Sequence, residues 1–399
     1  MRIFVADLRK QNKTKYKNTN IRRDYGVMTT SLDQIFLALL RFSLGIDESF
    51  PHRPTAEEWG KLYACACRQS MVGVTFCGVS RLSEASPADV PQRLVMQWAC
   101  DAEVIAGLND LQNRKAARLT ALFEQQGHHT AVLKGQANAR LYPDPLSRQP
   151  GDIDLYVDGG RERAEATLIA LGMAEGADSK SPHHFHLAPD EDGIEVEVHF
   201  KPGSGNLNPR TDRRLQAYLM QRFAEGAALC EAGFRVPSTA FALAMQLSHI
   251  GRHAVQFGVG LRQVTDYYLL LRSATDDERR QIGARLRELG LRHVGKALMW
   301  VLAEVYRLPK ALMIAKPDRR RGRWLLHRIL DGGNFGWYTT PRAANTAWQR
   351  FYGGRRHALG LIWFCPEESH GVLREEQRYW WNLFVTIPQR IKNRSLTID

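Results

Sequence analysis

The sequence predicts an α+β (mixed α/β) fold, in which a small mixed sheet is flanked by helical regions on both sides. Three observations carry this prediction. Apolar residues recur at helical spacing over residues 28–126. Short segments in which apolar and polar residues alternate, a pattern typical of strands, replace this spacing over residues 127–235. Helical spacing returns over residues 236–399. We expect these ranges to be separate regions of the chain, preceded by a polar tail of residues 1–27.

Composition narrows the class of protein further. Hydrophobic residues make up 44 % of the 399 residues and charged residues 24 %, which excludes a wholly disordered or collagen-like chain. The six cysteines are scattered and lack the spacing of a disulfide framework or a zinc knuckle. No apolar run reaches the roughly 18 residues of a membrane span, and no secretory signal follows the basic N-terminus. We therefore expect a cytoplasmic protein.

The positive charge of the chain is concentrated in two segments. Lys and Arg number 55 against 42 Asp and Glu, a net charge of +13. Residues 1–27 hold eight basic and two acidic residues, and residues 316–323 hold five basic and one acidic. We expect a disordered tail, or a translation start at Met28, for the first segment and a solvated basic loop for the second. The functional alternative at both is contact with RNA or another anionic partner.

The helical regions are predicted from the spacing of their apolar residues. In the N-terminal region, Ser31 is a plausible N-cap for the first helix. A break at residues 331–334 precedes a Trp-rich stretch, in which residues 379–394 could form a basic amphipathic helix that packs against the body. The helices expected are residues 30–44, 57–73, 91–126, 239–256, 260–273 and 276–306.

The region between them alternates strands and helices. A turn-rich stretch over residues 136–150 contains three prolines and separates the first strand from the second. Strands are expected at residues 129–133, 152–157, 183–187 and 194–200, and helices at residues 137–142 and 161–171.

Two carboxylates are predicted to lie side by side on the second strand. Asp152 and Asp154 are two residues apart, so both side chains point to one face of the strand. Two ionised carboxylates repel each other, and a cation between them relieves that repulsion. Oxygen ligands in this arrangement favour Mg²⁺ or Mn²⁺. The alternative is an ordinary solvated strand face.

A third carboxylate is available on a later strand. Glu195, Glu197 and His199 share one face of residues 194–200. If the two acidic strands are neighbours, three carboxylates could hold two divalent ions about 3.5–4 Å apart, the arrangement used for phosphoryl or nucleotidyl transfer. Spacing alone does not distinguish Glu195 from Glu197.

A glycine turn precedes these carboxylates in the chain. Gly135 follows a strand and precedes a possible helix, where a glycine lets a phosphate approach the backbone. Lys134 and Arg148 could add charge-assisted contacts to that phosphate. The alternative for Lys134 and Gly135 is an ordinary turn.

Five histidines are candidates for a site: three lie on or near the strand that carries Glu197, and two lie on a later predicted helix. His184 and His186 share a strand face, so a transition-metal site with a carboxylate is conceivable. His199 is better suited to orient a carboxylate or contact substrate. His249 and His253 lie four residues apart on a helix, but no Glu follows His249 as in the zinc motif, which favours a structural or substrate-contact role.

Arg262 and Asp266 are also four residues apart on a predicted helix. One interpretation is an ion pair on the helix surface, worth about 0.3–0.5 kcal/mol. The other is that they form part of a helical wall that faces the active cleft, on the acceptor side, together with His199, His249 and His253.

The order of these motifs resembles the nucleotidyltransferase superfamily with a DNA polymerase β-like core. The segment Lys134-Gly135, the segment Asp152-Ile-Asp154-Leu and the later Glu197-Val-His199-Phe resemble its branch of uncharacterised nucleotidyltransferases, over about residues 30–340. The resemblance implies a nucleotidyltransferase-like sheet core. It also implies that Asp152 and Asp154 are the metal-binding pair, that Glu197 rather than Glu195 is the third acidic ligand, and that Gly135 is the loop glycine.

The activity implied by the resemblance is metal-dependent transfer of a nucleoside monophosphate from an NTP, such as ATP, to an acceptor hydroxyl on a small molecule, protein or RNA. Asp152, Asp154 and Glu197 would bind Mg²⁺ or Mn²⁺, and Glu197 could act as base. Gly135 and Gln136 would contact phosphate, supported by Lys134 and Arg148. Gln136 stands where the superfamily usually has Gly or Ser, which favours a catalytically inactive binding or regulatory protein as the alternative. The basic segments favour a toxin-like tRNA nucleotidyltransferase.

Overall fold

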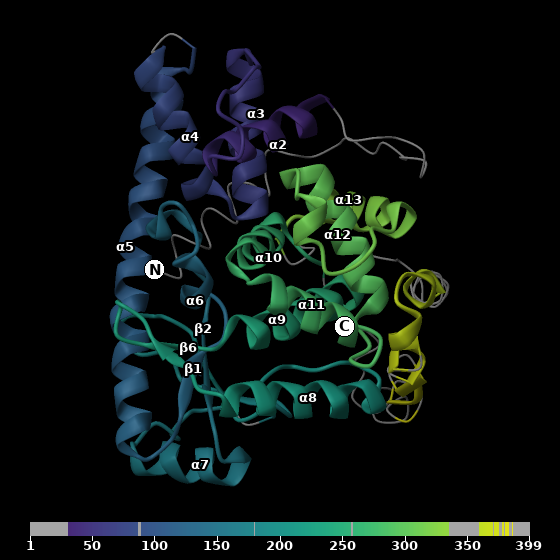
Figure 1. Ribbon diagram of the computed structural model, residues 1–399. Coiled ribbons are helices and arrows are strands. Elements are labelled where there is room, and N and C mark those ends of the chain that lie inside the picture. The colour runs from purple at the N-terminus through teal and green to yellow at the C-terminus, as the bar shows by residue number, and fades with distance from the viewer. Residues whose placement is uncertain are drawn as a thin grey trace.

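The computed structural model describes residues 31–86, 89–178, 180–256, 258–334, 359–369, 371–374, 377–378, 380–382 and 385. Within them the predicted α+β fold is confirmed: a small mixed sheet stands between two groups of helices in the chain, and these two groups pack against each other beside it (Figure 1). The predicted tail of residues 1–27 and most of the predicted helix at residues 379–394 lie outside the described residues. The predicted division of the chain into regions stays a prediction.

Four helices form the N-terminal group: α2 (Ser31–Ser43), α3 (Ala56–Gln69), α4 (Val72–Ala85) and α5 (Gln92–Gln125). The single helix predicted at residues 57–73 is wrong at its end. Ser70 adopts a left-handed conformation (φ 55°, ψ 46°) and its amide caps α3, so the chain turns before α4 begins. The sequence prediction missed α4 because it contains Gly73 and Gly78, which are poor helix formers. Both glycines permit close packing, since a Cβ at either position would collide with Ser147 or Ser43.

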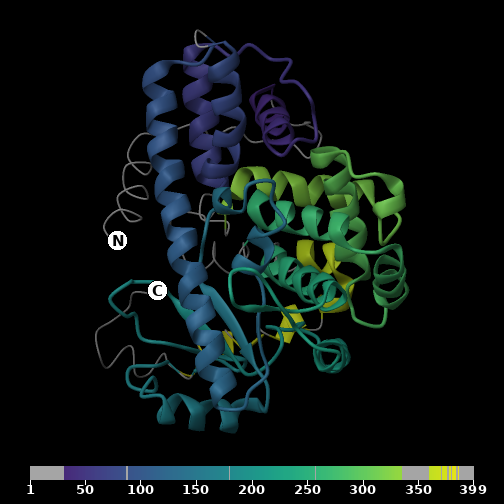
Figure 2. The same cartoon turned by 60° about the vertical axis from the view of Figure 1, so that its left-hand side comes forward.

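Helix α5 connects the helical group to the sheet. It has 34 residues and is therefore about 50 Å long, and it runs from the bundle of α2–α4 down one side of the sheet (Figure 2). Trp98 and Ile105 pack with the helical group, whereas Leu119 and Phe123 pack under the strands. One helix thus fixes the position of the sheet relative to the helical group.

The four-stranded sheet has the order β1-β2-β4-β3. Strand β2 pairs with β4 in parallel, so that Asp154 lies opposite Glu197, and both outer pairs are antiparallel. Helix α7 (Gly160–Ala170) lies in the crossover between β2 and β4. The strands are β1 (Thr130–Val132), β2 (Ile153–Val157), β3 (His184–His186) and β4 (Val196–His199).

The two faces of this sheet differ in chemistry. Ile153, Leu155 and Val198 are buried in an apolar cluster against α5 and α7. The alternate residues point the other way, toward helices α8 (Pro209–Ala224) and α9 (Thr239–Gln256), and they include Asp154 and Glu197. Strand alternation therefore places the predicted carboxylates on the face of the sheet that is turned toward α8 and α9.

The C-terminal group differs from prediction at several points. The segment at residues 276–306 forms two helices, because a turn after Arg285 interrupts it. The expected basic loop at residues 316–323 is wrong from Arg319 onward: Asp318 caps the N-terminus of α13 through the amide of Arg321. Helix α8 was not predicted. The remaining elements are β5 (Ala228–Leu229), β6 (Arg235–Val236), α10 (Leu261–Ser273), α11 (Asp276–Arg285), α12 (Arg292–Tyr306) and α13 (Arg319–Gly332).

Across the described ranges, no helix combines the length and the hydropathy that a membrane crossing requires.

Candidate functional site

The parallel pairing of β2 and β4 brings three carboxylates together. Asp154 is paired with Glu197 in register, and Asp152 lies just before β2. One oxygen of each carboxylate lies within 4.8 Å of the others, which suits a shared cation. Glu195 is exposed and does not belong to this group. We call Asp152, Asp154 and Glu197 the carboxylate trio.

Two basic side chains contact the carboxylate trio. The Lys134 Nζ lies 3.0 Å from Oδ1 of Asp154. The His199 Nε2 lies 2.9 Å from the same oxygen and 3.2 Å from Oε2 of Glu197. Asp154 and His199 are both almost fully buried, so these contacts are little weakened by water.

These contacts keep the carboxylates ionised. Burial raises the pKa of Asp154, but Lys134 and His199 outweigh it and lower that pKa. Burial also raises the pKa of Glu197, but the hydrogen bond and charge of His199 together with the charge of Lys134 outweigh it and bring that pKa to about 2. Burial lowers the pKa of His199, and its hydrogen bonds to Asp154 and Glu197 raise it by more. Asp154 and Glu197 therefore carry anionic oxygens at neutral pH, which is the state that binds a cation.

Gly135 turns the chain immediately above Asp152. Its backbone angles are φ 57° and ψ −110°, a combination that residues with a Cβ avoid. A Cβ there would come within 3.4 Å of the Asp152 carbonyl oxygen. Position 135 therefore requires glycine on conformational grounds, whatever the loop binds.

The Gln136 side chain points away from the carboxylates and into α5. Its Nε2 donates hydrogen bonds to Asn109 O at 3.2 Å and to Asn113 Oδ1 at 2.9 Å, and the residue is buried. The side chain that departs from the superfamily pattern thus anchors the one-turn helix α6 (Gln136–Ala139) to α5.

Helix α5 also holds the loop that leads into β2. The Asn109 Nδ2 donates to Leu146 O at 2.7 Å and to Arg148 O at 2.8 Å. Gln112 donates to Gly151 O, directly before Asp152. Sequence reasoning missed both residues. The available signal was their position, because Asn109 and Gln112 are polar residues that lie at helical spacing between the apolar Ile105 and Ala116.

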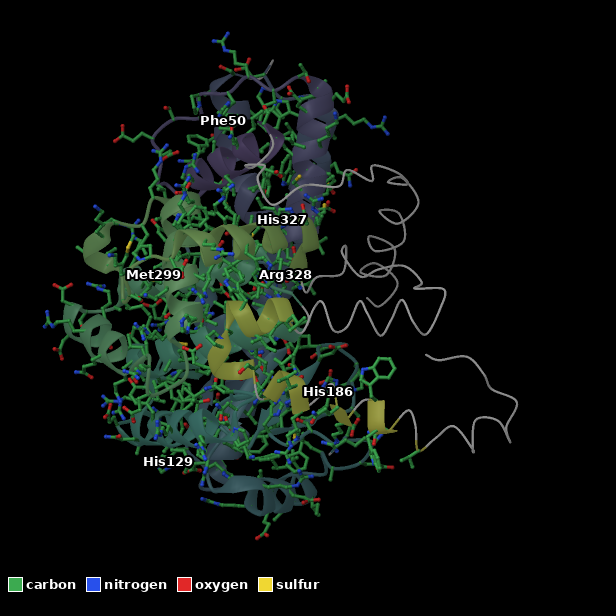
Figure 3. All side chains as sticks on the ribbon, turned by 90° about the vertical axis from the view of Figure 1, so that its right-hand side faces the viewer. Phe50, His129, His186, Met299, His327 and Arg328 are labelled. Carbon is green, nitrogen blue, oxygen red and sulfur yellow. The ribbon has the colours of Figure 1, made fainter. Side chains whose placement is uncertain are left out.

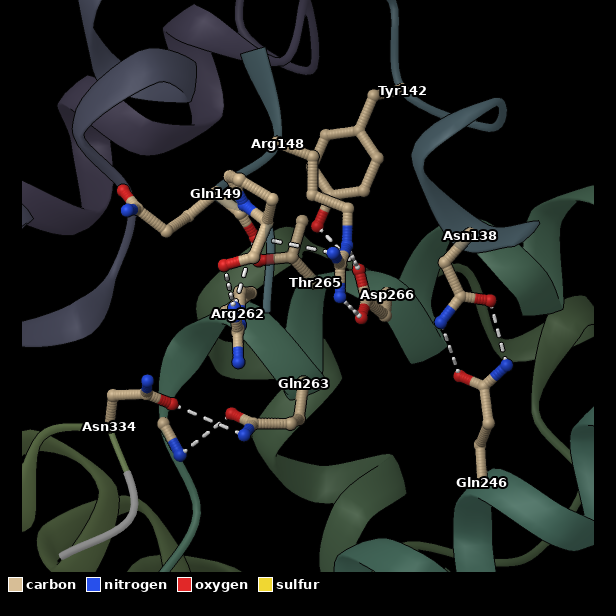
Figure 4. Close-up of polar contacts among 12 residues, drawn as sticks. Asn138, Tyr142, Arg148, Gln149, Gln246, Arg262, Gln263, Thr265, Asp266 and Asn334 are labelled. Carbon is tan, nitrogen blue, oxygen red and sulfur yellow. Dashed lines mark hydrogen bonds and ion pairs between the residues drawn. The ribbon is translucent and has the colours of Figure 1, made fainter. Parts of the chain in front are cut away.

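Arg148 forms a buried ion pair with Asp266, as Figure 4 shows. The pairs Nε–Oδ1 and Nη2–Oδ2 are both 2.8 Å long, and Tyr142 Oη donates to Oδ1 at 2.7 Å. The third nitrogen, Nη1, donates to Gln149 O at 3.2 Å. All three guanidinium nitrogens of Arg148 thus contact protein acceptors, although the sequence suggested a phosphate contact.

The interpretation of Arg262 and Asp266 as an ion pair on the helix surface is wrong. Both residues are buried, and Asp266 pairs with Arg148. The Arg262 Nη1 donates to the carbonyls of Gln149 and Pro150, at 3.0 and 3.1 Å. Burial and the neighbouring Arg148 lower the pKa of Arg262 to about 10. Arg262 therefore ties the loop before Asp152 to α10.

A pocket lies between the carboxylates and the helical wall of α9 and α10. The Asn138 and Gln246 side chains join the two sides through reciprocal amide hydrogen bonds of 3.0 and 2.8 Å (Figure 4). The lining residues are Lys134, Gly135, Asn138, Arg148, Gly151, Asp152, Asp154, Gln246, His249, Ile250, Arg262, Gln263 and Asp266. Most of the predicted site residues therefore face one cavity.

The imidazole rings of His249 and His253 are in contact on α9, with centroids 4.2 Å apart and an angle of 50° between their planes. His249 lines the pocket, and His253 does not. Burial, followed by the charge of Lys134, lowers both pKa values, to about 4 for His253. Both imidazoles are therefore neutral at neutral pH. Neither belongs to a group of metal-ligating side chains among the described residues.

Comparison with known proteins supports the resemblance seen in the sequence. A family model described as uncharacterised nucleotidyltransferase matches residues 55–307, more than half of the chain. The matched range contains the carboxylate trio and every residue that lines the pocket. A search of curated proteins finds no match. The chain belongs to this family of uncharacterised nucleotidyltransferases.

Proposed function

We propose that this protein is a metal-dependent nucleotidyltransferase. It would transfer a nucleoside monophosphate from an NTP to an acceptor hydroxyl and release pyrophosphate. The observation that carries this proposal is the meeting of Asp152, Asp154 and Glu197 beside the Gly135 turn, at the edge of a pocket. The family match supports a general role in nucleotidyl transfer.

The donor set of the trio fits a hard divalent cation. Three carboxylates offer oxygen ligands, which suit Mg²⁺ or Mn²⁺. A cation held by these residues would neutralise charge on the phosphate oxygens of the NTP. Two basic contacts on Asp154, from Lys134 and His199, hold the carboxylate in place before any cation binds.

The other residues have separate tasks in this proposal. Lys134 contacts Asp154 and lines the pocket, so its ammonium can shift to a phosphate oxygen. Gly135 lets that phosphate approach the backbone. Glu197, with a pKa of about 2, is a weak base at neutral pH, so we assign it the ligand role. His249 and Arg262 line the opposite wall, which would receive the acceptor.

A second candidate is a nucleotidyltransferase-fold protein that binds ligands without catalysis. Two contacts favour it. The Lys134 ammonium already pairs with Asp154, where it partly balances the trio, and Gln136 is occupied with α5. Such a protein would bind a nucleotide or another anion at the pocket but release no pyrophosphate.

The test is pyrophosphate release from each of ATP, CTP, GTP and UTP with Mg²⁺, in the presence of a cell extract that supplies acceptors. We expect release with the wild-type protein and none with Asp152→Asn. Glu195→Gln is the matched control, because Glu195 is a carboxylate directly before β4, as Asp152 is before β2, but it is exposed and outside the trio. Its activity should equal the wild type.

Calorimetric titration with each NTP and Mg²⁺ separates the two candidates. Binding without pyrophosphate release, unchanged in Asp152→Asn, would favour the inactive protein. No binding of any NTP would contradict the nucleotidyltransferase and would restrict the second candidate to an anion other than an NTP.

A further inference from the structure

A second cluster of metal-ligating side chains lies beside the carboxylate trio. The register of β3 and β4 pairs His184 with His199 and His186 with Glu197. Ligand atoms of His184, Glu197 and His199 lie within 4.8 Å of one another. None of these three residues lines the pocket described above. We call them the histidine–glutamate cluster.

The distances within this cluster match the edges of a coordination polyhedron. Glu197 Oε2 lies 3.2 Å from His199 Nε2 and 3.4 Å from His184 Nδ1. Ligand atoms bound at about 2.1 Å to a tetrahedral or octahedral ion lie about 3.0–3.4 Å from one another. One carboxylate oxygen is thus placed to share an ion with both imidazoles.

The Nδ1 nitrogen of His184 has no hydrogen bond within the part of the chain that the structure describes. Its Nδ1 is buried and faces Glu197 Oε2 at 3.4 Å, yet the contact lacks the geometry of a hydrogen bond. An unsatisfied buried nitrogen costs free energy, which a bound ion would recover.

His199 supplies the more deeply buried nitrogen of the cluster. Its side chain is 5 % exposed, and without an ion its Nε2–H donates to Asp154 and Glu197, so an ion bound at Nε2 would displace that proton. It thereby joins the histidine–glutamate cluster to the trio, while Glu197 belongs to both.

We propose that His184, Glu197 and His199 bind a transition-metal ion of intermediate softness, with Zn²⁺ as its representative. Two imidazoles and one carboxylate form a donor set used for zinc and for mononuclear iron, whereas Mg²⁺ favours oxygen ligands throughout. The protein then has two cation positions of different chemistry that share Glu197. The inference concerns metal content and does not rest on the proposed nucleotidyl transfer.

The test measures Zn²⁺ bound to the full chain after dialysis against micromolar Zn²⁺ in excess Mg²⁺. We expect about one Zn²⁺ per chain in the wild type. His184→Ala should lower the Zn²⁺ affinity at least about 100-fold, since it removes one of three ligands. Asp152→Asn should leave that affinity unchanged, because Asp152 belongs only to the trio. Co²⁺ replacing Zn²⁺ should give a visible absorption spectrum that His184→Ala alters.

His129→Ala is the matched control. His129 is an exposed histidine next to β1, at the opposite sheet edge from β3 and its His186 (Figure 3). Its Zn²⁺ content should equal the wild type. Circular dichroism checks that each variant is folded, and His184→Gln replaces His184→Ala if the latter is not.

Three results would overturn the proposal: equal Zn²⁺ affinity in His184→Ala and wild type, loss of Zn²⁺ in Asp152→Asn, or displacement of Zn²⁺ by excess Mg²⁺. Retained Zn²⁺ in a wild-type protein that releases no pyrophosphate would contradict the proposed function and leave this inference standing.

Discussion

Asp154 and Asp266 are both buried and both have a lowered pKa, but their surroundings differ. Asp266 is held by two parallel hydrogen bonds from Arg148 and a third from Tyr142. Asp154 lies among further carboxylates and meets only single contacts from Lys134 and His199. The pair at Asp266 balances its charge within the fold, whereas the trio concentrates negative charge beside a pocket. The comparison distinguishes a carboxylate that supports the fold from one that is suited to bind a cation.

The largest expected effect separates activity from stability at Asp154. Asp154→Asn should lower nucleotidyl transfer at least about 1000-fold, because it removes a ligand that acts on the reacting phosphate. It should lower the free energy of unfolding by less than Asp266→Asn does, since it also relieves the repulsion between Asp154 and Glu197. Pyrophosphate assays and urea unfolding measure the two quantities. A loss of several kcal/mol would show that Asp154 supports the fold as Asp266 does.

The opposite outcome is expected at Asp266. Asp266→Asn leaves the buried guanidinium of Arg148 without its counter-charge, which should lower the free energy of unfolding by about 3–5 kcal/mol. The double variant Arg148→Met/Asp266→Leu should recover much of this loss, because neither charge is then buried. Urea unfolding curves of the three proteins provide the measurement. A single-variant loss below about 1 kcal/mol would contradict the assigned role.

Glu368 is a buried carboxyl whose hydrogen bonds, within the part of the chain that the structure describes, come from backbone amides and not from a basic side chain. Burial raises its pKa to about 7 although the amides of Leu207 and Asn208 donate to its Oε2. The folded state therefore holds this proton more tightly than the unfolded chain does, for which the ordinary value is 4.5. Stability from this group is present below about pH 4.5 and falls as the pH rises toward about 7, by on the order of 3 kcal/mol.

Glu368→Gln should remove that fall, because its amide oxygen accepts the same hydrogen bonds without ionising. Urea unfolding at a series of pH values compares the variant with the wild type. Parallel pH profiles for the two proteins would contradict the raised pKa of Glu368.

The smallest effect is expected at Lys134. Lys134→Met should weaken NTP binding about 10-fold, since one charge-assisted contact to phosphate is lost. Lys61→Met is the matched control, because Lys61 pairs with Glu57 on the exposed surface of α3. Calorimetric titration with an NTP and Mg²⁺ measures both variants. Tighter binding to Lys134→Met would indicate that Lys134 competes with the cation and would favour the inactive protein.

Local sequence patterns were sufficient to predict the parts of the site that depend on the alternation of side chains along a strand. Alternation in residues 152–157 and 194–200 places Asp152, Asp154 and Glu197 on one face, because successive side chains in a strand point to opposite sides. The long apolar stripe of α5 was equally readable. These features follow from the geometry of a single backbone segment.

Tertiary structure decided the partners. Arg148 and Asp266 are 118 residues apart, and no local pattern pairs them. Gln136 anchors α6 to α5, and His184 joins Glu197 because β3 forms the edge of the sheet beside β4. The exposed position of Glu195 likewise depends on where β4 begins. A buried polar side chain pairs with whatever distant segment packs beside it, so its role is set by contacts between elements and not by its neighbours in sequence.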